Sequence, residues 1–313
     1  GLILAIAEND RRVVLRIPEN TNEYPPAYSR GEYAAAERLA WSPDGTRLAS
    51  AGSRSEVHIW QPALWRSNGY TGSILICGTE EVVASYERIY RLVWTPDGSR
   101  IMAGREDGCL ISWHASTGSG YRLQKRHAKA ITALAFSPRE EHLLLTASAD
   151  TTVQIWDEVA EQEQVRFEHT ASVTTAVWSP DGKVVASCER EDPTISLWSS
   201  QTGHLVARIP LSMYTIHDLT VYALAWSPDG ALLAAVCDDG AVQLIDMALH
   251  QHIQTFWADA TSRRTVKALA WSPDSTLLAS GGTSAQVDIW QVRSPQAEKE
   301  EVAQRVQAEE SSR

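Results

Sequence analysis

The chain has 313 residues and a hydrophobic content of 43%, which is enough apolar sequence to bury a sizeable core. Its 39 Asp and Glu residues outnumber its 28 Lys and Arg residues, so the formal net charge is −11 at pH 7. This balance disfavours a protein that binds nucleic acid through the phosphate backbone, because such binding needs clustered Lys and Arg.

The four cysteines, Cys77, Cys109, Cys188 and Cys237, lie far apart in the sequence, which has no Cys-x-x-Cys pair. We therefore interpret them as small buried hydrophobic residues in a reducing compartment, and we expect no structural zinc site. The opening apolar run, residues 2–7, is too short for a signal peptide or a membrane span. These features predict a soluble cytoplasmic protein that makes no contact with a membrane.

One phrase returns along the chain: an aromatic residue followed two positions later by proline, most often within Trp-Ser-Pro-Asp-Gly. The aromatic residues, which lie 42 to 53 positions apart, are Trp41, Trp94, Phe136, Trp178, Trp226 and Trp271. A repeat of this period predicts an array of small units that together bury one continuous core. Function is then expected on a surface that the units share.

The first unit is partial. Residues 1–8 align with residues 45–52, and residues 12–17 align with residues 56–60, so Gly1 stands at the glycine of a Pro-Asp-Gly turn. The strand that should precede this turn would lie before Gly1. We therefore expect the sequence to be a piece of a longer chain, although the long segment 61–93 is an alternative source of the missing strand.

Residues 127–167 show the organisation of one unit most clearly. The runs 131–136 and 143–147 are apolar and read as buried strands, and 152–156 alternates as a third strand. A more polar fourth strand is expected at 164–167. Four short strands with turn residues between them predict an all-β array.

The Pro-Asp-Gly phrase has the composition of a tight turn. Proline presets the first central backbone angle, aspartate bonds back to the backbone, and glycine accepts a positive φ. The phrase is intact at Pro43, Pro96, Pro180 and Pro228, and Ser275 replaces its glycine in the last repeat. We expect it to join the first and second strands of each unit.

These repeats resemble the WD-repeat family of β-propellers, and in particular bacterial propellers in which Trp-Ser-Pro-Asp-Gly is frequent. The similarity covers residues 1–292. It implies an all-β fold, a seven-bladed propeller of four-stranded antiparallel blades, with the first and last blades incomplete in this chain. In this family the strand that closes the ring usually comes from the N-terminal end.

The resemblance implies a single propeller domain over residues 1–293. A partial first repeat occupies residues 1–36, and six further repeats are expected to start near residues 37, 86, 127, 169, 217 and 262. Residues 294–313 are rich in charge, and we expect them to form a helical or disordered tail.

In the family, a His, a Ser or Thr, a turn Asp and a Trp form a hydrogen-bonded network within a blade. The residues of this sequence that match are His127, Thr146, Asp150 and Trp156 in one repeat, and His169, Ser187, Asp192 and Trp198 in the next. The second set also contains the residue types of a hydrolase triad. We favour a structural role, because the same pattern recurs at the same phase of two repeats.

A partner-binding surface is expected where loops converge on one face of a propeller. The position four residues before each repeat aromatic should open onto this face, and it holds Glu37, Tyr90, Thr132, Thr174, Tyr222 and Lys267. The turns between second and third strands add Arg54, Glu106, Glu191 and Asp238. Of these, Tyr90 and Tyr222 are the large amphipathic residues that often anchor interfaces. The alternative is that they simply cover the rim of the core.

The sequence predicts no enzyme, no catalytic residue, no cofactor and no metal. We expect an interaction scaffold, or a sensor or regulatory module, that binds a protein or peptide and belongs to a larger protein with an effector domain upstream. The alternative is a propeller-type hydrolase with a metal in the central tunnel. It is disfavoured because the expected inner strands carry mainly Ala, Leu, Val and Thr. Nucleic acid is a third, less favoured partner, suggested by Arg263, Arg264 and Lys267 alone.

Overall fold

A computed structural model of residues 1–313 shows an all-β protein. It describes residues 4–7, 12–16, 27–28, 36–52, 56–61, 75–77, 87–211, 220–237, 239–257, 266–282 and 287–292. The chain divides into two compact units, Gly1–Gln164 and Val165–Arg313. The tail 294–313 and the residues Arg54, Asp238, Arg263 and Arg264 lie outside the described residues.

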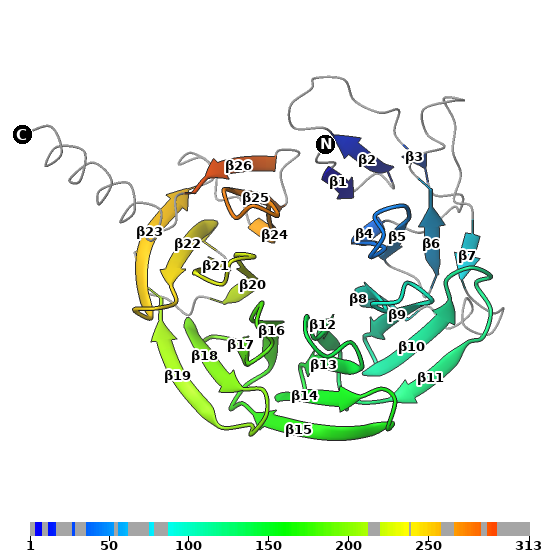
Figure 1. The fold of residues 1–313 in the computed structure, drawn as a ribbon, viewed down its shortest axis with the longest axis horizontal. Helices are drawn as coiled ribbons and strands as arrows, with labels where there is room; N and C mark the ends of the chain where they lie inside the picture. Colours follow the sequence, from blue (N-terminus) through cyan, green and yellow to red (C-terminus); the bar gives the residue numbers. More distant parts are fainter. Residues whose placement is uncertain are drawn as a thin grey trace, which may run out of the picture. The chain divides into compact units, whose positions relative to one another are not determined.

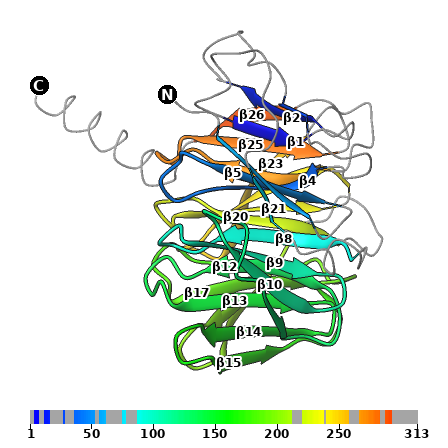
Figure 2. The ribbon, with the colours of Figure 1, turned by 90° about the vertical axis from the view of Figure 1, so that its right-hand side faces the viewer.

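Unit 1 holds four sheets, in which neighbouring strands are antiparallel and follow chain order (Figure 1). The first sheet is β1 (Leu4–Ala7), β2 (Arg12–Arg16) and β3 (Ala27–Tyr28). The second is β4 (Ala36–Trp41), β5 (Leu48–Gly52), β6 (Val57–Trp60) and β7 (Leu75–Cys77). The third is β8 (Ile89–Trp94), β9 (Arg100–Arg105), β10 (Cys109–His114) and β11 (Arg122–Lys125). The fourth is β12 (Ile131–Phe136), β13 (Leu143–Ser148), β14 (Thr152–Asp157) and β15 (Gln162–Glu168), which Figure 2 shows from the side. The last residues of β15, 165–168, belong to unit 2.

Unit 2 holds three sheets of the same design. The first is β16 (Val173–Trp178), β17 (Val184–Glu189), β18 (Thr194–Ser199) and β19 (Leu205–Pro210). The second is β20 (Val221–Trp226), β21 (Leu232–Cys237), β22 (Ala241–Asp246) and β23 (Gln251–Trp257). The third, β24 (Val266–Trp271), β25 (Leu277–Gly282) and β26 (Val287–Gln291), has three strands among the described residues.

The number of blades differs from the sequence-based expectation. The all-β propeller class is confirmed, but the prediction of seven blades is wrong, because six sheets form blades. These six begin with a strand that ends in the repeat aromatic. The remaining sheet, β1 to β3, has strands of only 4, 5 and 2 residues and lacks that first strand. Among the described residues, β1 to β3 therefore do not make up a blade of the same design.

The turn phrase works as its composition predicts. The hydroxyl of Ser42 donates to the carboxylate of Asp44 at 2.5 Å, and that carboxylate also accepts the backbone N–H of Thr46 at 3.0 Å. These bonds, the Ser42 hydroxyl foremost, lower the pKa of Asp44 to about 2. Gly45 completes the turn with a φ of +67°, and Ser275 takes the same position in the last repeat with a φ of 61°. The phrase joins the first and second strands of its blade.

The repeat aromatics link one blade to the next within each unit. Trp94 of β8 donates its indole N–H to the carbonyl of Ala40 on β4 at 2.9 Å. In unit 2, Trp271 of β24 donates to the carbonyl of Ala225 on β20 at 3.0 Å. Each indole packs among the apolar residues of its unit. The aromatic residue that recurs in every repeat therefore makes a contact between neighbouring blades at these two positions.

Candidate partner-binding surface

A β-bulge lies at the start of the first strand in each of the six blades. In β8, for example, Ile89 pairs with Arg105 and Arg91 pairs with Gly104, so Tyr90 between them has no partner in the register. The other residues skipped in this way are Glu37, Thr132, Thr174, Tyr222 and Lys267. A bulge redirects a side chain away from the regular alternation of a strand. We call these six residues the bulge positions; they are the residues that the sequence places four before each aromatic.

In unit 1, the structure brings several of the predicted surface residues together. The hydroxyl of Tyr90 lies 3.4 Å from a carboxylate oxygen of Glu106, in the exposed turn after β9. Arg88 lies over the Tyr90 ring, with 5.7 Å between its guanidinium carbon and the ring centroid, and it forms an ion pair with Glu37 at 2.5 Å. Glu37, Tyr90 and Glu106 therefore share one charged surface at the start of β4 and β8.

Two arginines that the sequence-based reasoning missed complete this surface. Arg38 of β4 donates from Nε to the carbonyl of Tyr90 at 2.7 Å, and Arg91 of β8 donates from Nη1 to the same carbonyl at 2.8 Å. Each arginine directly follows a bulge position. The other four repeats have Ala133, Thr175, Ala223 and Ala268 there. Comparing the repeats column by column would have revealed both arginines.

In unit 2, three of the predicted surface residues, Tyr222, Lys267 and Glu191, are exposed, and Thr174 is half-buried. Tyr222 on β20 has 38% of its surface exposed, and Lys267 on β24 is also exposed. Glu191 is exposed, with its carboxylate 3.8 Å from Nε of Arg190 and a φ of 62°. Tyr222 thus stands at a bulge as an accessible aromatic side chain, as an anchor for a partner requires.

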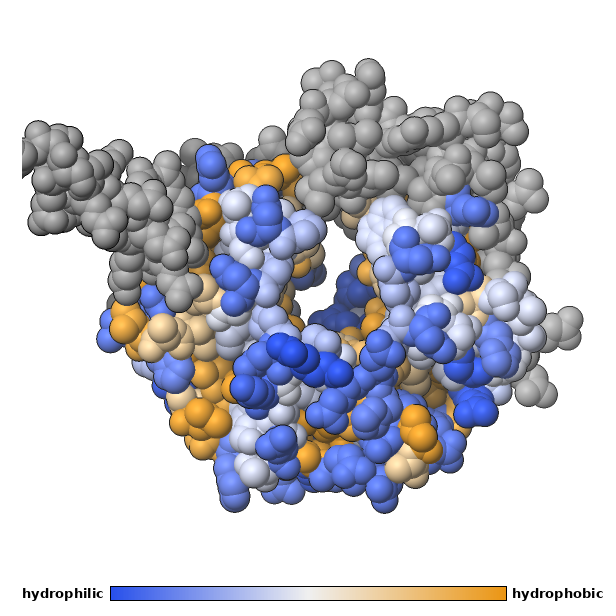
Figure 3. All heavy atoms as spheres, in the orientation of Figure 1, coloured by the Kyte–Doolittle hydropathy of each residue, from blue (hydrophilic) through white to orange (hydrophobic). Residues whose placement is uncertain are grey.

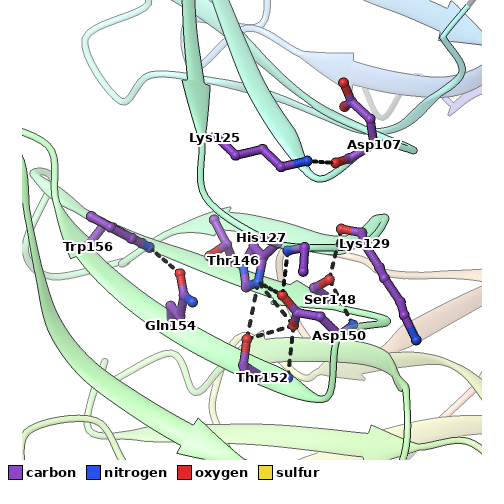
Figure 4. Close-up of polar contacts among 11 residues, drawn as sticks. Asp107, Lys125, His127, Lys129, Thr146, Ser148, Asp150, Thr152, Gln154 and Trp156 are labelled. Atoms are coloured by element: carbon purple, nitrogen blue, oxygen red, sulfur yellow. Dashed lines mark hydrogen bonds and ion pairs between the residues drawn. The ribbon is translucent and has the colours of Figure 1, made fainter.

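The network around His127 is hydrogen-bonded, but its tryptophan takes a different partner (Figure 4). His127 Nε2 lies 2.8 Å from the Thr146 hydroxyl, and His127 Nδ1 lies 3.1 Å from the Asp150 carboxylate. The Trp156 indole donates to the side chain of Gln154 at 2.8 Å and not to Thr146. Gln154 is long enough to reach the indole on its own strand. The carboxyl pKa of Asp150 is raised by burial, but the Thr152 hydroxyl, the Ala128 amide and His127 outweigh burial and lower it.

The network around His169 differs at its acid. His169 Nε2 lies 2.9 Å from the Ser187 hydroxyl, and the Trp198 indole donates to the same hydroxyl at 2.8 Å. Glu189, not Asp192, lies beside the histidine, 3.3 Å from Nδ1. Glu189 also accepts the backbone N–H of Thr170 at 2.8 Å. Asp192 is displaced because the turn that contains it is one residue longer than the turn with Asp150, and the longer glutamate reaches back instead.

These contacts leave no reactive group for hydrolysis in the second network. Ser187 has 0% of its surface exposed, so no substrate can reach its hydroxyl, and that hydroxyl already bridges an indole and an imidazole. Burial lowers the pKa of His169, and the nearby Glu189 carboxylate opposes this only in part. The arrangement has the form of a buried structural network.

The described part of the chain offers no metal-binding cluster and no membrane-spanning helix. It holds no group of three or more His, Cys, Asp or Glu side chains that could bind a metal ion. It also holds no helix that is long and apolar enough to cross a membrane.

Two family models match the chain. The model of the IFT122 first beta-propeller matches residues 88–308, and the model of the WD domain, G-beta repeat, matches residues 34–61. The chain is similar to Protein HIR1 of Cryptococcus neoformans, with 28% identity over 62% of this chain and 24% of the relative. It is similar to the WD repeat-containing protein slp1 of Schizosaccharomyces pombe, with 25% identity over 67% of this chain and 40% of the relative.

A third relative is Actin-interacting protein 1 of Drosophila melanogaster, with 25% identity over 79% of this chain and 39% of the relative. The chain therefore spans less than half the length of each of these relatives, all of which are eukaryotic. The family model of the propeller covers more than half of the chain. From the six blades, the repeat phrase and these matches, the chain belongs to the family of WD-repeat β-propellers that the IFT122 first beta-propeller represents.

Proposed function

We propose that this chain is a non-catalytic scaffold, or the sensor or regulatory module of a larger protein, that binds a protein or peptide partner. The bulge at the start of the first strand in six blades carries this proposal. It gives every repeat one redirected side chain at the same place. Those side chains vary between glutamate, tyrosine, threonine and lysine, whereas the strand residues that follow them are mostly Ala, Leu and Val.

The relatives support the same function. Propellers of this family are protein-interaction scaffolds, and nothing about the relatives points to a hydrolase. One relative is named as an actin-interacting protein, which makes binding to another protein a reasonable expectation for this chain as well. Because Ser187 is inaccessible, the second network gives no support to a serine hydrolase.

The wider setting of the chain is part of the proposal. The chain matches less than half of each relative, which is consistent with a module fused to an effector domain. The frequent Trp-Ser-Pro-Asp-Gly phrases favour the bacterial type of such modules. A net charge of −11 favours a protein partner over nucleic acid, and free buried cysteines are consistent with the cytoplasm.

The experiment is an affinity measurement on tyrosine variants. A partner is isolated from the source organism with the full chain as bait, and its Kd is measured for the wild type, Tyr90→Ala and Tyr222→Ala. We expect at least one variant to weaken binding by about tenfold or more, because a central aromatic anchor contributes about 2 kcal/mol. Val159→Ala, at a side chain that is 82% exposed and far in sequence from the bulges, is the control. Unchanged binding in both tyrosine variants would contradict the proposal.

A further inference from the structure

Three arginines gather at the start of β4 and β8 in unit 1, and we call Arg38, Arg88 and Arg91 the arginine cluster. Figure 3 shows strongly hydrophilic residues beside these two strands. Arg88 has a carboxylate partner in Glu37 at 2.5 Å. Arg38 and Arg91 instead donate to backbone carbonyls: both donate to that of Tyr90, at 2.7 and 2.8 Å, and Arg38 also donates from Nη1 to that of Glu37 at 2.9 Å. A carbonyl oxygen accepts both bonds with its two lone pairs but neutralises neither positive charge.

Two buried arginines elsewhere in unit 1 are paired with carboxylates. Arg105 and Arg126, whose side chains are 8% and 4% exposed, each have a carboxylate within reach, from Asp107 at 2.9 Å and Glu158 at 3.0 Å. Arg47 has no carboxylate but donates from both terminal nitrogens to two carbonyls and lies over the Trp94 ring. Among the described residues, Arg91 makes one hydrogen bond, although a guanidinium carries five N–H donors.

The electrostatics of Arg91 point in the same direction. Burial foremost, and then the positive charge of Arg38, lower its pKa to about 10. Burial also lowers the pKa of Arg38, and Glu37 offsets this in part while Arg88 adds to it. Both groups are still charged at pH 7. Two partly buried guanidinium groups that repel each other are costly unless an anion joins them.

We propose that the arginine cluster binds an anionic side chain of the partner, a carboxylate or a phosphate on a peptide, through the unused N–H donors of Arg91 and Arg38. This inference rests on the proposed scaffold function and specifies its partner. The planar guanidinium fork matches a carboxylate or a phosphate oxygen pair and forms charge-assisted hydrogen bonds with it. Tyr90, whose carbonyl accepts a hydrogen bond from both arginines, supplies an aromatic surface for the residue next to the anion.

The test uses labelled peptides with the full chain, and binding is measured by fluorescence anisotropy. The probes are hexaglutamate, a phosphoserine hexapeptide with glycine spacers, and hexaglutamine as the neutral control. We expect one or both anionic probes to bind and the neutral probe not to bind. Arg91→Met should weaken that binding by about tenfold or more, and Arg91→Lys, which keeps the charge but loses the fork, should weaken it less. Arg139→Gln, at an exposed arginine in the turn before β13, is the matched control.

The outcomes show whether the site prefers a phosphate or a carboxylate, and they also test whether the site exists. Preference for the phosphoserine probe assigns a phosphate, and preference for hexaglutamate assigns a carboxylate. Equal binding of hexaglutamine, no binding of either anionic probe, or an equal loss in Arg139→Gln overturns the inference. Far-ultraviolet circular dichroism shows whether each variant is folded, and Arg88→Met, at a side chain that is 43% exposed, replaces Arg91→Met if the latter does not fold.

The partner isolated for the scaffold experiment distinguishes the two proposals. If Tyr90→Ala weakens binding of that partner and Arg91→Met does not, the proposal of an anion site is wrong and the proposed scaffold function stands. If neither the tyrosine variants nor the arginine variants change binding of the partner, the scaffold surface itself is wrong.

Discussion

Replacing Ser187 with alanine should destabilise the protein more than replacing Thr146 with valine. The Trp198 indole can only donate, so the Ser187 hydroxyl accepts from it at 2.8 Å and donates its own proton to His169 Nε2 at 2.9 Å. His169 then carries its proton on Nδ1, which faces Glu189 at 3.3 Å. Alanine at position 187 thus leaves two buried groups without partners. Valine at position 146 removes the hydroxyl that faces His127 Nε2 and leaves the Trp156 bond to Gln154 intact.

The difference follows from the number of unsatisfied groups. Each buried donor or acceptor that loses its partner costs about 1–3 kcal/mol. The Ser187→Ala variant should therefore lose about 2–6 kcal/mol of unfolding free energy, and Thr146→Val about 1–3 kcal/mol. Both substituted side chains are 0% exposed, so differences in hydration do not blur the comparison.

The measurement is urea unfolding of both variants and the wild type, followed by far-ultraviolet circular dichroism. Equal m-values among the three proteins would show that the variants unfold in the same way. A loss in Ser187→Ala that is equal to or smaller than the loss in Thr146→Val would refute the shared-hydroxyl geometry of the second network.

Two further properties should follow from the described contacts. Burial lowers the native pKa values of His58 and His169 below their ordinary value of 6.5, so the unfolded chain binds more protons than the folded chain. The unfolding free energy should therefore fall as the pH drops from 7.5 to 5.5. Urea midpoints should fall with it, and a midpoint that rises as the pH drops would contradict this reasoning. Gly45→Ala should lower the unfolding free energy by about 1–2 kcal/mol in the same assay, because alanine must adopt a φ of +67°. The added Cβ would meet no atom within 4 Å, so the cost comes from the backbone alone. A loss near zero would show that the turn can change its conformation.

The strands of the blades were largely predictable from the sequence. The expected strands 131–136, 143–147 and 152–156 are confirmed as Ile131–Phe136, Leu143–Ser148 and Thr152–Asp157. Short apolar runs between Pro-Asp-Gly turns leave few other ways to bury the aromatic residues. The number of blades was harder to predict. Residues 1–8 align with residues 45–52 of a complete repeat and do form a strand, but a matching strand does not by itself show that a whole blade is present.

The candidate surface was only partly predictable. The period of the repeat places Tyr90 and Tyr222 correctly at equivalent positions, but it does not reveal that a bulge redirects them. The role of Glu189 was missed because one extra turn residue changes which acid reaches the histidine, and that depends on side-chain length in three dimensions. Arg38 and Arg91 were within reach of the sequence, since both interrupt a column that otherwise holds Ala and Thr.

Photo-crosslinking from the bulge positions tests the central claim most directly. Benzoylphenylalanine is introduced at position 90 or 222 of the full chain in its source cells, and at Val159 or Leu249 as controls, whose side chains are 82% and 59% exposed. The scaffold function predicts that position 90 or 222 yields a crosslinked protein partner that neither control position yields. Adducts from the control positions with none from 90 and 222 would contradict the claim that the bulge positions form the binding surface.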